Sequence, residues 1–454
     1  MTGWGTSHRT FFIDYNQVSP TVRPPTMSKN SKPKPAPDFY CSKTQGPVPG
    51  RGRSAFTART ASLLVAALIL SACGGAPYQP QSEGMAAVEA RAESQTMGDV
   101  RVSVAVPSPE ETETIFDLPL YDRGVQPVWL EVHNGGATDL RYAPVGTDPD
   151  YVPPFEVAYT QKSGFSGTAR KEMQQYLYGN AMPRSIDAGE VRSGFVFTQA
   201  RPGAKGVNID LFGPEADDAY SFVFFVPVPG YVADHAQVYF EALYSSADLT
   251  THDLAGLREA LGALPCCASD QLGDRAGDPL NLVLVGDGDY VLQALLRAGW
   301  FERMAAERGS SDSSAEAAYL YGRTADAVFR KLRPGTDERS SELRLWMTPM
   351  QLGDQPVWVG DVIHFLAGPE GPVGLDPDID YARDFFLQDL WYSQGLAKFA
   401  WLQGPNPVSI DQPRKAATGE EYFTDGYRIV MWPSGTPISL LEADYVSWDN
   451  PPER

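Results

Sequence analysis

The chain has 454 residues, of which 43% are hydrophobic, enough to fill more than one packed core. Its 37 Lys and Arg stand against 57 Asp and Glu, giving a formal net charge of −20 that argues against nucleic acid as a partner. Only one stretch is continuously apolar, and it is shorter than a bilayer-spanning helix. The composition therefore excludes a polytopic membrane protein.

That apolar stretch is ASLLVAALIL, residues 61–70, and it follows Arg51, Arg53 and Arg59. About ten apolar residues between basic and small residues are typical of a secretory signal peptide. A buried core helix is the alternative, but the Gly- and Pro-containing chain that follows does not favour it. We expect residues 51–72 to be the signal peptide of a bacterial lipoprotein.

The signal ends in Leu-Ser-Ala-Cys at residues 70–73, which resembles the lipobox of bacterial lipoproteins. The resemblance implies cleavage before Cys73 and attachment of lipid to its sulfur. It predicts a protein anchored to a membrane of the bacterial cell envelope and facing the periplasm. In a Gram-negative cell we expect the outer membrane rather than the inner one.

Residues 1–50 precede the signal and are rich in Pro, Ser and Lys, without apolar periodicity. We expect no folded role for them. A start at Met27, or a non-standard start at Val48, would leave a leader closer to ordinary length, so the first residues are also interpreted as a misassigned start.

After the signal, the chain is strongly acidic. Residues 1–72 hold nine basic and two acidic residues, which leaves 28 basic and 55 acidic residues in the rest. Residues 73–98 are small and polar, which predicts a lipidated flexible stalk. Because anionic headgroups repel an acidic protein, we expect the stalk to hold the folded part away from the membrane.

Residues 99–245 alternate apolar and polar side chains with a period of two, which predicts a β-sandwich-like domain. The expected strands cover residues 100–106, 128–132, 207–211, 221–228 and 237–243, with one short helix at 169–178. The run 221–228 is apolar throughout, so we expect it to lie wholly in the core.

Residues 255–445 mix helical and strand periodicity, which predicts an α+β domain and makes the whole chain α+β. We expect strands at 281–285, 399–402 and 428–432, a hairpin from 343–346 and 357–363, and helices at 290–299, 315–332 and 379–394.

Four segments of this domain together resemble the LssY C-terminal domain family: DPLNLVLVGDGDYVLQALLRAGW at 278–300, LRLW at 343–346, PVWVGDV at 356–362 and LDPDIDYARD at 375–384. The resemblance implies an envelope-associated domain without established chemistry. Family members often carry His two residues before Arg-Leu-Trp and a Thr-His pair before the Asp-Pro-Asp stretch. This chain has Glu342 and Pro372-Val373 there.

Asp287 and Asp289 follow a strongly apolar segment and precede a helix. This arrangement resembles the first motif of haloacid-dehalogenase-type phosphatases, in which the first Asp attacks phosphorus and the second is the general acid/base beside Mg²⁺. The remaining parts of such a site are not found in the sequence. The alternative is that an aspartate caps the following helix, and we favour it.

Asp376, Asp378 and Asp380 form a second acidic cluster. The cluster does not fit an EF-hand, because Tyr381 and Leu387 occupy the positions that need Gly and an acidic ligand. We expect Asp376 to cap a helix with Pro377 at its first position. A divalent cation shared by these residues with Asp287 and Asp289 is the alternative; otherwise no cofactor is expected.

Cys266 and Cys267 are adjacent, and the envelope is oxidising. A vicinal disulfide and two thiols that are free or paired elsewhere are equally compatible with the sequence. Most of the second domain's tryptophans are expected in its core, with a glycan or peptide groove as the alternative; those considered are Trp346, Trp358, Trp391, Trp401 and Trp432.

No complete catalytic constellation is found, so whether the protein is an enzyme stays open. We expect a binding or docking module for an envelope protein or wall component. The rival hypothesis is a Mg²⁺-dependent phosphate hydrolase that uses Asp287 and Asp289.

Overall fold

The computed structural model describes residues 76–148, 151–201, 203–215, 219–307, 318–333, 339–368, 371–416 and 419–452. In these ranges eight α-helices accompany several sheets of mostly antiparallel strands, so the chain is a mixed α+β protein, as predicted. No helix in the same ranges combines the length and the apolar composition needed to cross a membrane. The predicted signal peptide and Cys73 lie outside the described residues.

The N-terminal part, residues 76–228, contains two four-stranded antiparallel sheets, ordered β1-β2-β3-β6 and β5-β4-β7-β8. The strands are β1 (Glu93–Met97), β2 (Val100–Ala105), β3 (Val125–Asn134), β4 (Leu140–Tyr142), β5 (Ser185–Ile186), β6 (Val191–Gln199), β7 (Ala204–Phe212) and β8 (Ala219–Pro227). Apolar side chains from both sheets share one core, in which Val102, Leu130, Ile209 and Phe224 are each fully or almost fully buried. β8 alternates buried and partly exposed side chains, so the prediction that its whole apolar run lies in the core is wrong.

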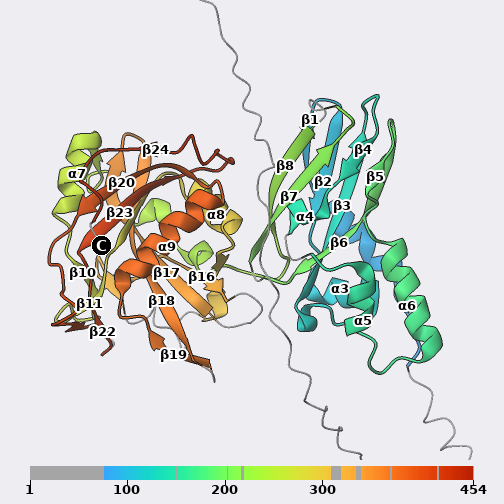
Figure 1. Cartoon of the computed structure of the whole chain (residues 1–454), viewed down its shortest axis with the longest axis horizontal. Coiled ribbons are helices and arrows are strands. Elements are labelled where there is room, and N and C mark those ends of the chain that lie inside the picture. The colour runs from blue at the N-terminus through green and yellow to red at the C-terminus, as the bar shows by residue number, and fades with distance from the viewer. Residues whose placement is uncertain are drawn as a thin grey trace, which may run out of the picture. The chain divides into compact units, whose positions relative to one another are not determined.

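A second core covers the other face of the β2-β3-β6 sheet and is built with helices. The helices of this part are α2 (Met85–Ala90), α3 (Pro109–Phe116), α4 (Pro144–Thr147), α5 (Pro154–Thr160) and α6 (Gly167–Gly179). Figure 1 shows α3, α5 and α6 gathered at one end of the sheets. The predicted helix at 169–178 is confirmed as α6, whereas α3 and α5 were not predicted.

The structure corrects the flexible stalk predicted for residues 73–98. Strand β1 pairs with β2 along its whole length, and α2 places Val88 in the helical core with no exposed surface. Tyr78 is also buried there. All five side chains of β1 are exposed, and β1 is the edge strand of its sheet. The sequence of β1 therefore lacks the buried apolar residues that predict a strand.

The predicted strand at 237–243 is also wrong. Residues 235–237 and 240–242 form two short 3-10 helices, η4 (His235–Gln237) and η5 (Phe240–Ala242). They belong to a segment that we name the strap, residues 231–244. The strap packs against the rest of the C-terminal part, residues 245–452, where Ala233 bridges to Met304 and the Tyr244 hydroxyl donates to the Met347 carbonyl at 2.8 Å.

The C-terminal part, residues 231–452, is built on a ten-stranded sheet with the order β13-β16-β17-β18-β12-β23-β20-β24, to which β9 and β19 add at β17 and β18. Its strands are β9 (Thr250–His252), β12 (Leu282–Val285), β13 (Phe301–Glu302), β16 (Ala327–Leu332), β17 (Arg339–Leu352), β18 (Gln355–Gly368), β19 (Gly371–Leu375), β20 (Leu396–Gln403), β23 (Tyr427–Pro433) and β24 (Asp444–Tyr445). Small strands flank it: β10 (Cys267–Ser269), β11 (Ala276–Pro279), β14 (Tyr319–Leu320), β15 (Arg323–Thr324), β21 (Arg414–Lys415) and β22 (Glu421–Tyr422).

Both faces of this sheet are covered, because successive side chains of each strand point to opposite faces. In β12, Leu282 and Leu284 pack with α8 (Gly288–Arg297) and α9 (Ile379–Tyr392), while Val283 and Val285 pack with α7 (Leu254–Gly262) on the other face. Figure 1 shows α8 and α9 on the same side of the sheet. The predicted hairpin is confirmed as β17–β18, and the helix predicted at 379–394 is confirmed as α9.

The helix predicted at 315–332 is wrong, because the described residues of that segment form β14, β15 and β16. Tyr321 and Gly322 join β14 to β15, and both have positive φ, 53° and 73°. Two consecutive positive φ values are typical of a tight hairpin turn. The apolar spacing that favoured a helix therefore belongs to strands on both sides of a turn.

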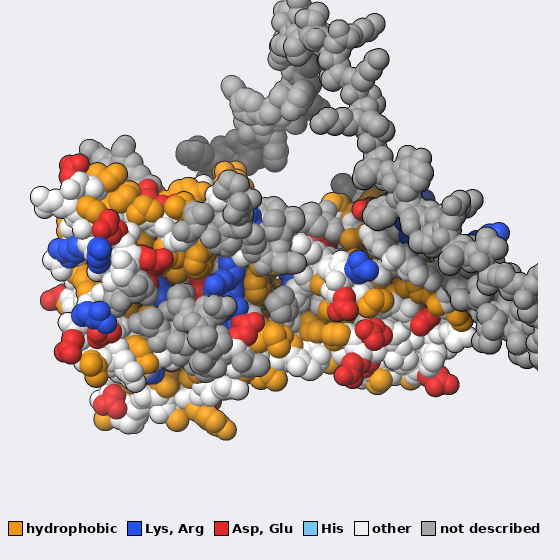
Figure 2. Space-filling model, turned by 90° about the horizontal axis from the view of Figure 1, so that it is seen from below, with side chains coloured by type: hydrophobic (Ala, Val, Ile, Leu, Met, Phe, Trp, Pro, Cys, Tyr) orange, Lys and Arg blue, Asp and Glu red, His pale blue; other side chains and the backbone are white. Residues whose placement is uncertain are grey.

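Figure 2 shows one face of the molecule, on which acidic, basic and apolar side chains are interspersed. The described side chains of this face form no continuous basic stripe.

Candidate functional site

A cavity of about 560 Å³ lies in the C-terminal part, between α8, the sheet and the strap. This volume falls within the range of small-ligand sites. The sheet contributes residues from β16, β17 and β18, and α8 contributes Val291 and Leu292. Its apolar lining consists of Ala236, Val238, Phe240, Val291, Leu292, Ala327, Phe329, Leu345, Met347, Pro356 and Trp358.

Trp358 lines the cavity and is held by two contacts. Its Nε1 donates a hydrogen bond to the Gly286 carbonyl at 3.0 Å, and the Phe240 ring packs edge-on against it with centroids 5.3 Å apart. Gly286 itself has a φ of 149°, which a residue with a side chain rarely adopts. The turn between β12 and α8 therefore fixes one wall of the cavity.

The strap forms another wall of the cavity and is held by a buried ion pair. Arg303 Nε donates to Asp234 Oδ2 at 2.8 Å, and the two side chains are 1% and 0% exposed. His235 Nε2 lies 3.4 Å from Glu302 Oε1, and its ring stacks on Phe329. These contacts hold Val238 and Phe240 over the sheet.

Carboxylates surround the mouth of this apolar cavity. Asp287, Asp289 and Glu241 all line it and are exposed, while the lining residues that the structure describes include no Lys or Arg. The mouth is therefore negatively charged, and the interior is apolar.

Asp287 is the N-cap of α8, and its Oδ1 accepts the Asp289 N–H at 2.9 Å. The capping interpretation of the sequence is thus confirmed for Asp287, and the structure places both aspartates at the mouth. Among the described residues that line this cavity there is no Ser, Thr or Lys to complete a phosphatase site.

The second acidic cluster lies at the N-terminus of α9 and accepts hydrogen bonds from backbone N–H groups there. Asp378, rather than the predicted Asp376, is the N-cap and accepts the N–H groups of Asp380 and Tyr381, while Asp376 accepts the Asp378 N–H at 3.0 Å. Asp380 is buried and accepts the Thr424 hydroxyl at 2.7 Å. Burial raises the pKa of Asp380, and the nearby Arg383 opposes that rise.

The two aspartate clusters lie at opposite ends of the sheet. Val285, next to the first cluster, pairs with Val357, whereas the Asp376 N–H donates to the His364 carbonyl. His364 follows Val357 by seven residues along β18, which corresponds to roughly 20 Å. The clusters therefore do not share a cation, and in the described part of the chain no group of three or more His, Cys, Asp or Glu residues could hold a metal ion.

Sequence reasoning missed a buried ion cluster that joins β11, β17 and β18. Arg344 Nε donates to Asp361 Oδ1 at 2.6 Å, and its Nη2 donates to Asp278 Oδ2 at 2.5 Å. Burial raises the pKa of Asp361 to about 7, although Arg344 acts to lower it. Asp361 Oδ2 is buried without a hydrogen-bond partner among the described residues.

Glu342, at the place where family members often carry His, is fully buried two residues before Arg344. Arg339 Nη1 donates to its Oε2 at 2.9 Å, and Arg330 Nε lies 3.4 Å from the same oxygen. In this chain the position therefore carries a buried carboxylate paired with arginines.

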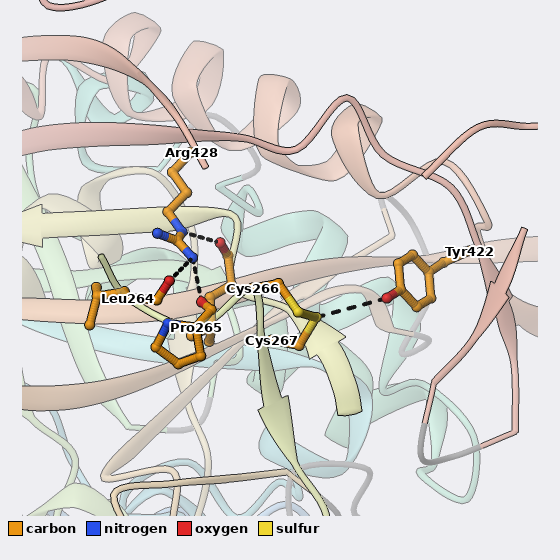
Figure 3. Close-up of a disulfide and its surroundings, with 7 residues drawn as sticks. Leu264, Pro265, Cys266, Cys267, Tyr422 and Arg428 are labelled. Carbon is orange, nitrogen blue, oxygen red and sulfur yellow. Dashed lines mark hydrogen bonds between the residues drawn. A yellow bond between two sulfur atoms is a disulfide. The ribbon is translucent and has the colours of Figure 1, made fainter. Parts of the chain in front are cut away.

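Cys266 and Cys267 are joined by a disulfide, of which Cys267 is buried and Cys266 is partly exposed (Figure 3). The Tyr422 hydroxyl lies 3.8 Å from Cys267 Sγ. Next to the disulfide, the guanidinium of Arg428 donates to four backbone carbonyls, those of Leu261, Leu264, Pro265 and Leu280. Burial lowers the pKa of Arg428 to about 10. Its hydrogen bonds to the backbone fix the turn that precedes Cys266.

The five tryptophans considered in the sequence analysis do not form a common groove. Trp358 and Trp401 belong to one core cluster, with Trp391 packed against it, whereas Trp346 and Trp432 belong to the cluster on the other face of the sheet. Of the five, only Trp358 lines the cavity.

A comparison with known proteins finds a family match within the C-terminal part. No curated protein matches the chain. The family model described as LssY C-terminus matches residues 263–427, which run from the end of α7 into β23 and include the cavity walls on α8, β16, β17 and β18. The resemblance seen in the sequence is thus confirmed, and this segment of the chain is an LssY C-terminal domain.

Proposed function

We propose that this protein is a lipid-anchored bacterial envelope protein, attached through Cys73 and facing the periplasm, that docks an envelope partner in the cavity of its C-terminal part. The observation that carries the proposal is the apolar cavity of about 560 Å³ with Asp287, Asp289 and Glu241 at its mouth. An outer-membrane location in a Gram-negative cell is part of the proposal. The two N-terminal sheets that share a core are interpreted as a β-sandwich.

The chemistry of the cavity defines the partner. Apolar walls favour an apolar side chain, because its burial stabilises the complex by about 25 cal/mol per Å². The carboxylates favour a positive charge just outside the cavity. The expected partner is a protein segment with an apolar anchor next to Lys or Arg, and a wall component with a cationic group is the other form of the same hypothesis.

The test is photocrosslinking in intact cells, with a photoreactive amino acid in place of Met347, which lines the cavity. We expect one reproducible envelope protein, crosslinked through an apolar segment that contains a basic residue. Ala236→Trp fills the mouth of the cavity and should abolish the crosslink. Ala242→Trp is the matched control, because Ala242 is also an exposed strap residue but does not line the cavity.

The charge of the mouth is tested separately. Asp289→Lys should weaken capture, whereas Asp354→Lys in the exposed β17–β18 turn makes the same charge change away from the cavity and should leave capture intact. Equal capture by all four variants would refute docking at this cavity.

The proposed attachment of lipid to Cys73 is tested by a separate measurement. Cells fed a palmitate analogue should label the wild-type chain and not Cys73→Ser, and separation of the two membranes by density should place the labelled chain in the outer membrane. The rival phosphate hydrolase would instead release phosphate with Mg²⁺ in a way that requires Asp287. No contact at the site favours it.

A further inference from the structure

The described chain begins on the connection between α5 and α6. The Ala76 N–H donates to the Gly164 carbonyl at 3.0 Å, and Ala76 bridges to Phe165. The buried Tyr78 ring then packs edge-on against Phe165 and Tyr176, with centroid distances of 6.0 and 5.9 Å. The start of the folded chain is therefore fixed to the α5–α6 hairpin.

Cys73 precedes Ala76 by only three residues in the sequence. Three residues of fully extended chain span at most about 11 Å. A lipid on Cys73 therefore holds the α5–α6 hairpin close to the membrane surface, and the acidic protein cannot stand off on a long stalk.

The outer face of this hairpin carries three exposed aromatic side chains, which we name the aromatic stripe: Phe155, Tyr159 and Tyr178. They are 54%, 64% and 63% exposed. Phe155 and Tyr159 are four residues apart on α5 and share a helix face, and the Phe155 and Tyr178 rings lie 5.3 Å apart. The stripe is therefore continuous across both helices.

Basic side chains accompany the stripe. Lys162 Nζ lies 3.4 Å from the centre of the Tyr159 ring, and Lys162, Arg170 and Lys171 are all exposed. The hairpin also carries the exposed Glu156 and Glu172, so its net charge is slightly positive in a strongly acidic chain. Aromatic rings with nearby Lys and Arg are typical of surfaces that lie in the headgroup layer of a membrane.

The inner face of the hairpin is packed, which fixes the direction of the stripe. Val157, Met173 and Leu177 have no exposed surface and belong to the core on the β2-β3-β6 sheet. The stripe is thus the outer surface of a fixed pair of helices.

We propose that the aromatic stripe lies in the headgroup layer of the membrane that holds the Cys73 lipid. This inference rests on the proposed lipidation of Cys73. A tether of this length gives a local concentration in the millimolar range, so a surface that binds lipid weakly by itself becomes occupied. The lipid provides attachment, and the stripe orients the N-terminal part on the membrane.

The experiment uses the full chain in cell membranes, with a photoreactive amino acid in place of Phe155 and, as the matched control, of Phe212. Phe212 is a similarly exposed Phe, at 48%, at the end of β7 in the other sheet. We expect crosslinks to phospholipid from position 155 and none from position 212. Equal labelling of the two positions, or a protein crosslinked at position 155 in place of lipid, would overturn the proposal.

A second pair of variants separates this inference from the proposed lipidation. Cys73→Ser should release the chain from the membrane, which tests attachment alone. The triple variant Phe155→Ser, Tyr159→Ser, Tyr178→Ser should stay attached but become cleavable by trypsin at Lys162, which we expect to be protected in the wild type. If Cys73→Ser stays on the membrane, the lipidation is wrong; if the triple-Ser variant is as protected as the wild type, only the stripe is wrong.

The same chain bound to vesicles distinguishes apolar insertion from charge attraction. Protection of Lys162 should persist on phosphatidylcholine vesicles and be similar on vesicles that also contain phosphatidylglycerol, because the stripe acts through its rings. Protection that requires phosphatidylglycerol would contradict the proposed role of the rings.

Discussion

The N-terminal part and the C-terminal part of the molecule are each stabilised by a different kind of buried residue. The N-terminal part packs rows of Val and Phe between two sheets, and its buried ion pair joins Lys205 Nζ to Asp148 Oδ2 at 3.1 Å. The C-terminal part buries several arginines with acidic partners, among them Arg303, Arg344 and Arg383. Apolar packing tolerates substitution of similar volume, whereas a buried charge depends on its partner.

The largest expected effect comes from breaking an ion cluster in the C-terminal part. Arg344→Met leaves Asp278 and Asp361 buried without their cation, and we expect it to destabilise this part by about 3–5 kcal/mol. Hydrogen exchange of the β17 amides measures the loss locally, apart from the N-terminal strands. Lys205→Met is the counterpart in the N-terminal part and should cost less, because it leaves one carboxylate instead of two.

A triple variant tests whether uncompensated charge causes this loss of stability. Arg344→Met combined with Asp278→Leu and Asp361→Leu removes the uncompensated charge, and it should recover much of the protection. If the triple variant is less stable than Arg344→Met alone, the cluster contributes through its geometry rather than through its charge balance.

The next effect is a pH dependence specific to the C-terminal part. The folded pKa of Asp361 is raised to about 7 by burial, above the usual value of about 3.9 in an unfolded chain. Its contribution to stability is therefore complete below about pH 4 and is lost as the pH rises through 7. The stability should fall by up to about 1.4 kcal/mol per pH unit in this window.

Asp361→Asn mimics the protonated carboxyl group and should flatten this dependence in urea unfolding at pH 5 and pH 8. The groups that influence Asp361 are Arg344, Asp278 and Glu342. The pKa of Glu420 is also raised by burial, so part of the slope should remain in the variant. An unchanged slope in Asp361→Asn would show that other groups cause it.

The same contrast explains what the sequence could predict. Strands β2, β3 and β12 and helix α9 follow from their own apolar periodicity, because each buries the face that its pattern defines. The strap and the β14–β15 turn could not be predicted: the first is held by the Asp234–Arg303 pair, and the second depends on positive φ at Tyr321. The apolar periodicity of the sequence indicates neither the ion pair nor the positive φ.

The candidate site was predicted only in part. The motif around Asp287 correctly indicated a strand, a turn and a capped helix, and both aspartates lie at the cavity mouth. The cavity itself joins Phe240 of the strap to Leu345 and Trp358 of the β17–β18 hairpin, and the strap and the hairpin are far apart in the sequence. The Arg344 cluster likewise joins residues that are 17 and 66 positions apart.

A smaller loss of stability is expected at the turn that precedes β10, where the contribution of Arg428 is compared with that of the Cys266–Cys267 disulfide. Arg428→Met leaves four backbone carbonyls without their donor, and we expect a loss of about 2–3 kcal/mol. The double variant Cys266→Ser, Cys267→Ser should cost less than about 1 kcal/mol, because a bond between adjacent residues closes no long loop of the unfolded chain. Thermal unfolding of both variants and the wild type gives the order, and a larger loss in the double Ser variant would contradict it.

The smallest effect tests the role of Asp287. As the N-cap of α8, Asp287→Ala should lose about 1 kcal/mol, whereas Asp287→Asn should lose little, since Asn also accepts the Asp289 N–H. A nucleophilic aspartate would behave differently: both substitutions would abolish any Mg²⁺-dependent release of phosphate, whatever their stability. Thermal unfolding and phosphate release, measured on the same three proteins with Asp354→Asn as the surface control, therefore separate the two roles. A stable Asp287→Asn protein that has lost phosphate release would make the cavity mouth a catalytic site, and equal behaviour of Asn and Asp leaves it a capped helix end that offers negative charge to a partner.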